Sequence, residues 1–197
     1  MTSWIRQLGW GVRWGIVVTI GCLAGVAGEA THPVATRELN VERFSVVSSR
    51  PFDEVLSRIE REVGHPDMAS LLRKIAAAKN ESELEDAVNQ TVGPTGLIEF
   101  NRFDLGEVLR KEQGERAPPM VRLLVGNPLI MKQMVNFVPD AGSYAPVTVL
   151  IDQRPDGVHV SYDRMSSFLA VYGSEKASQV ARALDAKIET LIKSAAF

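Results

Sequence analysis

Residues 122–165, RLLVGNPLIMKQMVNFVPDAGSYAPVTVLIDQRPDGVHVSYDRM, determine the architecture of this chain. An apolar strand runs into a Gly126-Asn127-Pro128 corner, and apolar residues then recur at helical spacing. Glycine permits a sharp corner, asparagine is a favoured helix N-cap, and proline fits the first helical position. The segment therefore predicts a strand, a capped helix and a hairpin. A free helix N-terminus can also bind an anion, but capping explains all three residue types at the corner.

The hairpin is closed by Arg154-Pro155-Asp156-Gly157, in which proline fixes φ and glycine supplies a permissive backbone. A loop that pairs Gln153 with Val158 places the apolar residues of both strands on one face and the polar residues on the other. His159 then lies opposite Asp152 on the polar face. Such a pair could orient an imidazole for proton transfer. We favour an ordinary exposed pair near a turn, since no nucleophile is identifiable nearby.

The same segment resembles a bacterial family known as domain of unknown function 302, in which an Asn-Pro corner opens a helix and a Pro-x-x-Val strand precedes a hairpin. Residues 44–63, FSVVSSRPFDEVLSRIEREV, resemble the family's opening strand and first amphipathic helix. The family has no established activity, so the resemblance implies a compact two-layer fold and self-association without implying a reaction. Many members carry cysteines around the corner. This chain has Gly126 and Ala145-Pro146 there, which rules out any thiol chemistry at those positions.

Residues 1–30 have the design of a secretory signal peptide, with a positively charged start, an apolar run over 14–27 and small residues after it. Cleavage is expected after Ala27 or Ala30. The apolar run is shorter than the roughly 20 residues that a spanning helix needs. We therefore predict an exported, periplasmic protein with no stable membrane span in its mature form.

Composition narrows the chemistry of the mature chain. Its single cysteine, Cys22, lies in the apolar run of the leader, and the residues before it fit a lipoprotein signal poorly, so we do not expect lipid attachment. Without Cys22 the mature chain has no disulfide, thiolate nucleophile or cysteine-ligated metal. The net charge is -2, and all three tryptophans lie in the leader. With no basic stripe to offset that charge, we predict no binding of nucleic acid.

Beyond the leader we expect a flexible segment over 31–40 and a single domain over 41–197. A polar helical pair over about 65–92 looks like an insertion relative to shorter relatives, and Ser82-Glu83-Leu84-Glu85 predicts a capping box within it. An amphipathic helix over 174–195 closes the chain. The predicted fold class is α+β: a two-layer mixed sheet with helices mainly on one face, which includes the hairpin and the closing helix.

The chain contains no phosphate-cradling glycine loop, no G-x-S-x-G elbow and no H-E-x-x-H motif. We predict no catalytic residue, metal or cofactor, and favour a non-catalytic periplasmic module that binds a small ligand or a protein. Its candidate binding residues are Asn127, Tyr144, Asp152 and His159, expected around one groove. The partner is unknown, and a homodimer is one expected assembly.

Two alternatives stay open. One is an enzyme of unrecognised type that uses His159 and Asp152 as an acid/base pair. The other is a metal-handling protein that uses methionines such as Met131 and Met134, although methionines three residues apart on a helix are more often core filler.

Overall fold

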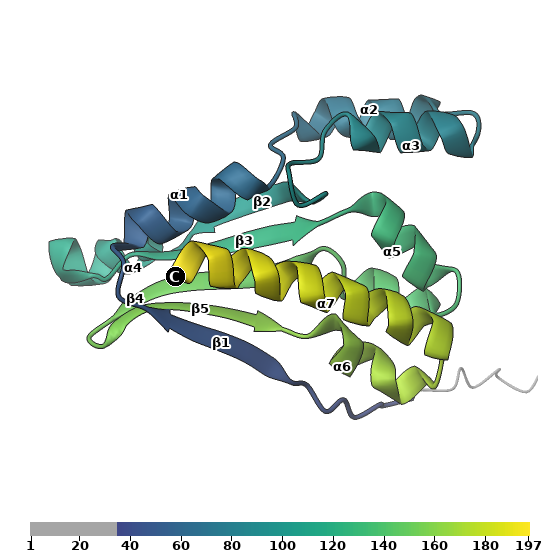
Figure 1. Ribbon diagram of the computed structural model, residues 1–197. Coiled ribbons are helices and arrows are strands. Elements are labelled where there is room, and N and C mark those ends of the chain that lie inside the picture. The colour runs from purple at the N-terminus through teal and green to yellow at the C-terminus, as the bar shows by residue number, and fades with distance from the viewer. Residues whose placement is uncertain (1–34) are drawn as a thin grey trace, which may run out of the picture. The chain divides into compact units, whose positions relative to one another are not determined.

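Figure 1 shows the computed structural model, which describes residues 35–197. The predictions about the leader, its cleavage and Cys22 fall on residues outside that range. Residues 37–197 form one compact unit, in which a single sheet carries most of the helices on one face. This arrangement confirms the predicted α+β fold class. Within residues 35–197 no helix is both long and apolar enough to cross a bilayer.

The sheet of this unit is open and has five strands in the order β1-β5-β4-β3-β2. The strands are β1 Arg43–Ser48, β2 Ile98–Asp104, β3 Met120–Gly126, β4 Val147–Arg154 and β5 Gly157–Asp163. All four strand pairings are antiparallel, whereas the sequence led us to expect a mixed sheet. The long helical connection from β1 to β2 joins opposite edges of the sheet, and each later connection returns the chain beside the strand it left. Because neither kind of connection places two consecutive strands side by side in the same direction, the sheet within residues 35–197 has no parallel pair of strands.

The hairpin of β4 and β5 has the register that its residue pattern predicted. Gln153 pairs with Val158, and Asp152 pairs with His159. One face of the hairpin is completely buried at Ile151 and at Val160, because alternate strand residues point to the same side. This face forms the inner face of the sheet and faces the helices.

Four helices cover the inner face of the sheet: α1 Phe52–Glu62, α5 Pro128–Val135, α6 Met165–Leu169 and α7 Glu175–Ala196. The closing helix α7 lies in the middle of this layer and touches the other three as well as β1 and β5. Ile188 and Ile192 on its buried stripe are completely inaccessible to solvent. Burial of each such side chain stabilises the folded state by about 2 kcal/mol. Helix α7 therefore covers the hydrophobic core and contributes strongly to its stability.

The remaining helical pair, α2 Met68–Ala77 and α3 Glu81–Asn89, lies beyond the β2 edge of the sheet (Figure 1). The chain enters the pair at Gly64 and leaves it at Gly93, and both backbone N–H groups donate to the carbonyl oxygen of Leu97, at 2.8 and 2.9 Å. A Cβ at Gly93 would lie 2.4 Å from the carbonyl carbon of Val63. Only glycine allows the two chain segments to approach this closely.

The N-terminus of α3 is capped two residues earlier than the sequence indicated. Asn80 accepts a hydrogen bond from the Glu83 backbone N–H at 2.9 Å, and Glu83 accepts one from the Lys79 backbone N–H at 2.8 Å. Asn80 has an extended backbone, as an N-cap residue must, whereas Ser82 already lies inside the first turn. The predicted box at Ser82 was therefore wrong, and a related pair lies two residues earlier, in which Glu83 accepts from the residue before the N-cap instead of from the N-cap itself.

One further helix and three short turns complete the unit. Helix α4, Leu105–Gln113, follows β2 directly. Its N-cap is Asp104, which accepts from the Glu107 backbone N–H at 2.8 Å. Short 3-10 turns join the remaining elements: η1 Gly114–Arg116, η2 Pro139–Ser143 and η3 Ala170–Tyr172.

Candidate functional site

Helix α5 starts at the end of β3, where Asn127 is its N-cap. The Asn127 Oδ1 accepts from the Leu129 backbone N–H at 2.7 Å, and its Nδ2 donates to the Gly96 carbonyl oxygen at 2.8 Å. Both ends of the amide are engaged, so the side chain ties the β3-α5 corner to the loop before β2. The capping role that the sequence favoured for Asn127 is the one the geometry shows.

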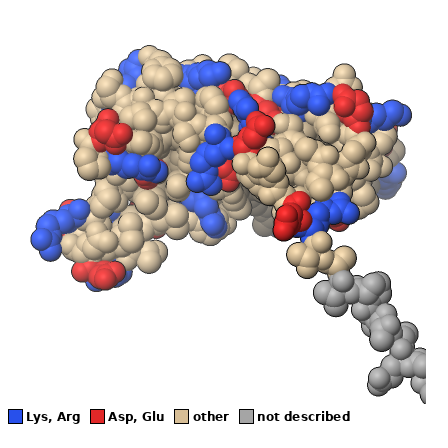
Figure 2. Space-filling model, turned by 90° about the horizontal axis from the view of Figure 1, so that it is seen from below, with Lys and Arg blue, Asp and Glu red and all other residues tan. Residues whose placement is uncertain are grey.

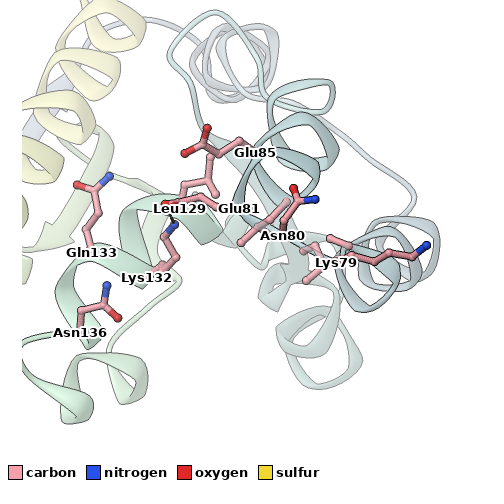
Figure 3. A pocket seen from close by; sticks show the side chains of 11 residues that line it. Lys79, Asn80, Glu81, Glu85, Leu129, Lys132, Gln133 and Asn136 are labelled. Carbon is pink, nitrogen blue, oxygen red and sulfur yellow. Dashed lines mark hydrogen bonds and ion pairs between the residues drawn. The ribbon is translucent and has the colours of Figure 1, made fainter.

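A groove of about 700 Å3 lies between α5 and the α2-α3 pair. It is lined by Ile75, Ala78, Lys79, Asn80, Glu81, Leu84, Glu85, Leu129, Lys132, Gln133 and Asn136. An ion pair joins Lys132 Nζ to Glu81 Oε1 at 2.6 Å, and this hydrogen bond lowers the pKa of the Glu81 carboxyl. Figure 3 shows the pair meeting in the middle of the groove, while Lys79 extends away from α5. A ligand in the centre of the groove would have to displace this ion pair.

A smaller cavity of about 150 Å3 lies at the Asn127 corner, against other residues of α5. It is lined by Phe100, Gly126, Asn127, Pro128, Ile130, Met131, Met134, Ala145, Pro146, Val147 and Leu184. All of these residues except Asn127 are apolar or have no side chain beyond hydrogen. An apolar cavity of this size admits a benzene-sized group. We refer to it below as the corner cavity.

The walls of the corner cavity come from four separate parts of the chain. An irregularity in the β2-β3 pairing falls between Glu99 and Asn101, next to Phe100, and the Ala145-Pro146 peptide bond is cis. Gly126 has no side chain to occupy the space between them. A Cβ at Gly126 would touch Phe100 and Pro146 at 3.5 Å, so even alanine would take up part of the cavity.

Tyr144 lines a neighbouring hollow that shares Pro146 and Val147 with the corner cavity. Its ring stacks on Phe168 with the centroids 4.8 Å apart, and its hydroxyl is 2.9 Å from that of Tyr172. The hydrogen bond with Tyr144 raises the pKa of Tyr172. The hollow is about 230 Å3 and includes Asp163 among its lining residues. Tyr144 therefore packs beside the Asn127 corner without lining the corner cavity.

His159 and Asp152 lie opposite each other on β5 and β4, as their register predicted, but each has another hydrogen-bond partner. The His159 Nε2 is 2.8 Å from Asp156 Oδ1, and this contact lowers the pKa of the Asp156 carboxyl. Asp152 is buried, and its Oδ2 accepts from Arg154 Nε at 2.5 Å. The hydrogen bond raises the pKa of Arg154. The structure shows no hydrogen bond in which Asp152 would orient the imidazole.

The four predicted binding residues fall into two groups. Asn127 and Tyr144 lie at the start of β4, whereas Asp152 and His159 lie at its other end, beside the turn. Since β4 is an extended strand, the two groups are separated by most of its length. The structure does not bring them around one groove.

The methionines of the metal-handling alternative lie in or beside the apolar interior, and Met131 is partly buried. Met134 and Met165 are completely buried, and Met131 and Met134 contribute to the lining of the corner cavity. Within residues 35–197 no three His, Cys, Asp or Glu side chains are grouped as a metal site. Core packing accounts for these methionines.

The antiparallel sheet and its one helical layer define a two-layer α+β protein, with small hollows near the start of β4. Residues 73–195 match the family described as domain of unknown function DUF302, and the chain belongs to that family. Its structure is similar to the crystal structure of an uncharacterised conserved DUF302 protein from Bacillus stearothermophilus. The TM-score is 0.54 and the identity 15%, over 78% of this chain and 97% of that one. At this identity the similarity concerns the fold alone. A comparison with curated proteins found no match.

Most residues of the corner cavity could not be identified from the sequence. Phe100 and Leu184 are far from the corner in sequence and come close only through the pairing of β2 with β3 and the packing of α7. Two signals were nevertheless present. A glycine precedes the cap, and a proline stands directly before β4, so that neither Gly126 nor Pro146 fills the corner with a large side chain.

Proposed function

We propose that this chain is an exported, non-catalytic binding module of the DUF302 family, and that its ligand inserts a small apolar group into the corner cavity. The observation that carries the proposal is the cavity itself, which is apolar and bounded by a helix start, a strand end and α7. Ligand sites are typically concave and mostly apolar, with a few polar groups that fix orientation. Here the Asn127 side-chain amide, which is hydrogen-bonded at both its oxygen and its nitrogen, fixes the geometry of the corner.

The cavity suits one part of a ligand better than a whole ligand. Its volume of about 150 Å3 is below the roughly 300 Å3 at which drug-sized ligand pockets begin. The neighbouring hollow beside Tyr144 shares Pro146 and Val147 with it. A ligand with an aromatic or branched apolar end in the corner cavity would extend toward Tyr144 and Ser143, where its polar part would meet water and hydroxyl groups.

The non-catalytic proposal rests on where the candidate acid and base lie. An enzyme that uses His159 with Asp152 requires the two side chains to be in contact, and each is hydrogen-bonded elsewhere. Proton transfer would also require a substrate within about 3 Å of the imidazole. Neither side chain lines the groove, the corner cavity or the Tyr144 hollow.

Toluene binding followed by thermal unfolding tests the proposed site. Toluene should raise the melting temperature of the wild-type protein saturably, because a ligand that binds only the folded state stabilises it. Leu184→Phe should fill the cavity and remove the effect, and Gly126→Ala, the milder change, should weaken it. Leu72→Phe places the same substitution on the exposed surface of α2 and should leave the effect intact. A stabilisation that is equal in all four proteins would contradict the proposal.

Export is the second part of the proposal, and it is supported by the sequence of residues 1–30. Expression with the native leader, followed by denaturing mass spectrometry of periplasmic protein, gives the mass of the mature chain. A chain that begins at about residue 28 or 31 supports export and cleavage. A mass that includes Cys22 with a lipid, or recovery only from the cytoplasm, would contradict it. Native mass spectrometry of the same sample would reveal a retained ligand or a homodimer.

A further inference from the structure

The face of the sheet away from α1 and α7 carries a hollow of about 200 Å3, which we call the open-face hollow. It is lined by Arg43, Leu105, Arg122, Thr148, Leu150, Ser161, Tyr162 and Asp163. The strand register accounts for this grouping. Arg43 pairs with Asp163 across β1 and β5, Ser161 pairs with Leu150, and Leu150 pairs with Arg122. These residues therefore lie in two neighbouring rows across the sheet.

Arg122 is held in place without an anionic partner. Its guanidinium lies over the ring of Phe103, with Cζ 4.6 Å from the ring centroid. Its Nε is buried and has no hydrogen-bond acceptor, and no ion pair found within residues 35–197 involves Arg122. Buried donors are nearly always hydrogen-bonded. A positioned guanidinium with donors to spare is a typical binding group for an oxyanion.

Arg43 contributes a second guanidinium with unused donors. Its Nε and Nη2 donate to the two carboxylate oxygens of Asp163 at 2.7 and 2.8 Å, and this pair lowers the pKa of the Asp163 carboxyl. The N–H groups of Nη1 are not used by Asp163. With two arginines and one aspartate, the lining carries a net charge of about +1 at neutral pH.

The rest of the lining offers hydroxyl donors and apolar walls. Ser161, which is only 8% exposed, and Thr148 contribute hydroxyl groups to the lining. Leu105, at the start of α4, and Leu150 supply apolar surface. The hollow thus combines charged donors, neutral donors and an apolar wall.

We propose that the open-face hollow binds the carboxylate of a small organic acid, with Arg122 as its main donor. A single negative charge matches the net charge of the lining, whereas the second charge of a phosphate would face Asp163. Planar carboxylates match the fork of a guanidinium in two parallel hydrogen bonds, and the leucines suit an apolar acid body. This site is independent of the corner cavity, which lies on the helix-covered side of the sheet.

Calorimetric titration with benzoate at low ionic strength tests the site. Wild-type protein should bind one benzoate per chain with a Kd on the order of millimolar, and the affinity should fall when NaCl is added. Arg122→Gln should weaken binding about tenfold or more, since a hydrogen bond to a charged group is lost. Arg122→Lys should weaken it less, because the charge remains while the fork is lost. The control is Arg102→Gln, which removes an exposed arginine that pairs with Glu60 and should leave the affinity unchanged.

Three results would overturn the proposal: no saturable benzoate binding to the wild type, equal binding by Arg122→Gln, or tighter binding of inorganic phosphate than of benzoate. Leu184→Phe separates this site from the corner cavity, because it should abolish the toluene effect and leave benzoate binding intact. The 1H-15N signal of Arg122 Nε–H provides a second readout that does not depend on variants. It should shift as benzoate is added, and an unchanged signal at saturation would equally contradict the assignment.

Discussion

The carboxylate of Asp185 accepts three hydrogen bonds in a buried position between α7 and α6. The donors are the Tyr162 hydroxyl at 2.5 Å and the backbone N–H groups of Met165 and Ser166 at 2.8 and 3.1 Å. Burial raises the pKa of Tyr162, and the negative charge of Asp185 adds to that effect. Asp185 thereby satisfies the first free amides of α6 from a different helix.

Replacement of Asp185 by alanine should destabilise the protein by about 3 kcal/mol, because it leaves buried donors without an acceptor. Urea unfolding measures the difference. Asp86→Ala, on the exposed surface of α3, is the matched control and should cost less than about 0.5 kcal/mol. If Asp185→Ala behaved like the control, the three hydrogen bonds would contribute nothing to stability.

Glu99 shows the opposite case, a partly buried carboxylate with too few partners. Its Oε2 has no hydrogen-bond partner, and the nearest ring nitrogen of His65 is 3.9 Å away. Burial raises the pKa of Glu99 above its ordinary value of 4.5, and the charge of His65 acts in the opposite direction. A pKa raised by folding means that the protonated form is favoured in the folded state. Stability is therefore highest below the unfolded-state pKa and declines as the pH rises through the folded-state pKa.

Glu99→Gln should accordingly be about 1 kcal/mol more stable than the wild type at pH 7, since a neutral amide replaces a poorly paired charge. The difference should disappear as the pH falls toward 4, where Glu99 itself is protonated. Chemical unfolding of both proteins across this range measures the effect, with Glu85→Gln on α3 as an exposed control. A gain that is independent of pH would show that the charge of Glu99 is not its cause.

At the scale of elements, most local signals were read correctly where the interacting residues are close in sequence, and the cap of α3 is the exception. The Asn127 cap, the Gln153-Val158 register and the closing helix were all predicted from neighbouring residues. Helix α6 was not predicted, because its five residues show no helical period and Asp185, which caps it, lies about 20 positions away. The corner cavity and the open-face hollow depend on strand order, which residue patterns do not determine.

The connection between the α2-α3 pair and the sheet depends on two glycines. Gly93→Ala should destabilise the protein by about 3 kcal/mol, since its Cβ would lie 2.4 Å from the Val63 carbonyl carbon and the two backbones would have to separate. Gly142→Ala is a matched control, because the nearest atom, Val135 Cγ2, is 3.8 Å from the added Cβ. Thermal unfolding of the two variants measures the difference. Equal melting temperatures would show that the connection between the α2-α3 pair and the sheet tolerates a side chain at Gly93.

At the scale of the whole unit, residues 37–197 bury one face of a sheet and leave the other without a helical layer. Lysine and arginine are interspersed with aspartate and glutamate on the face shown in Figure 2, and no extended surface of one sign appears there. That nucleic acid is not a partner stays a prediction from the net charge of the sequence. The two proposed sites lie on opposite sides of the sheet, so each can be tested while the other is kept intact.

The most direct test of the central claim is a toluene titration of protein labelled with 13C at the methionine methyl groups. Met131 and Met134 line the corner cavity, whereas Met68, Met120 and Met165 do not. The account predicts saturable shifts of the Met131 and Met134 signals with a common affinity, and unchanged signals from the other three. Unchanged Met131 and Met134 signals up to the solubility limit of toluene, or equal shifts of all five, would contradict a ligand site at the Asn127 corner.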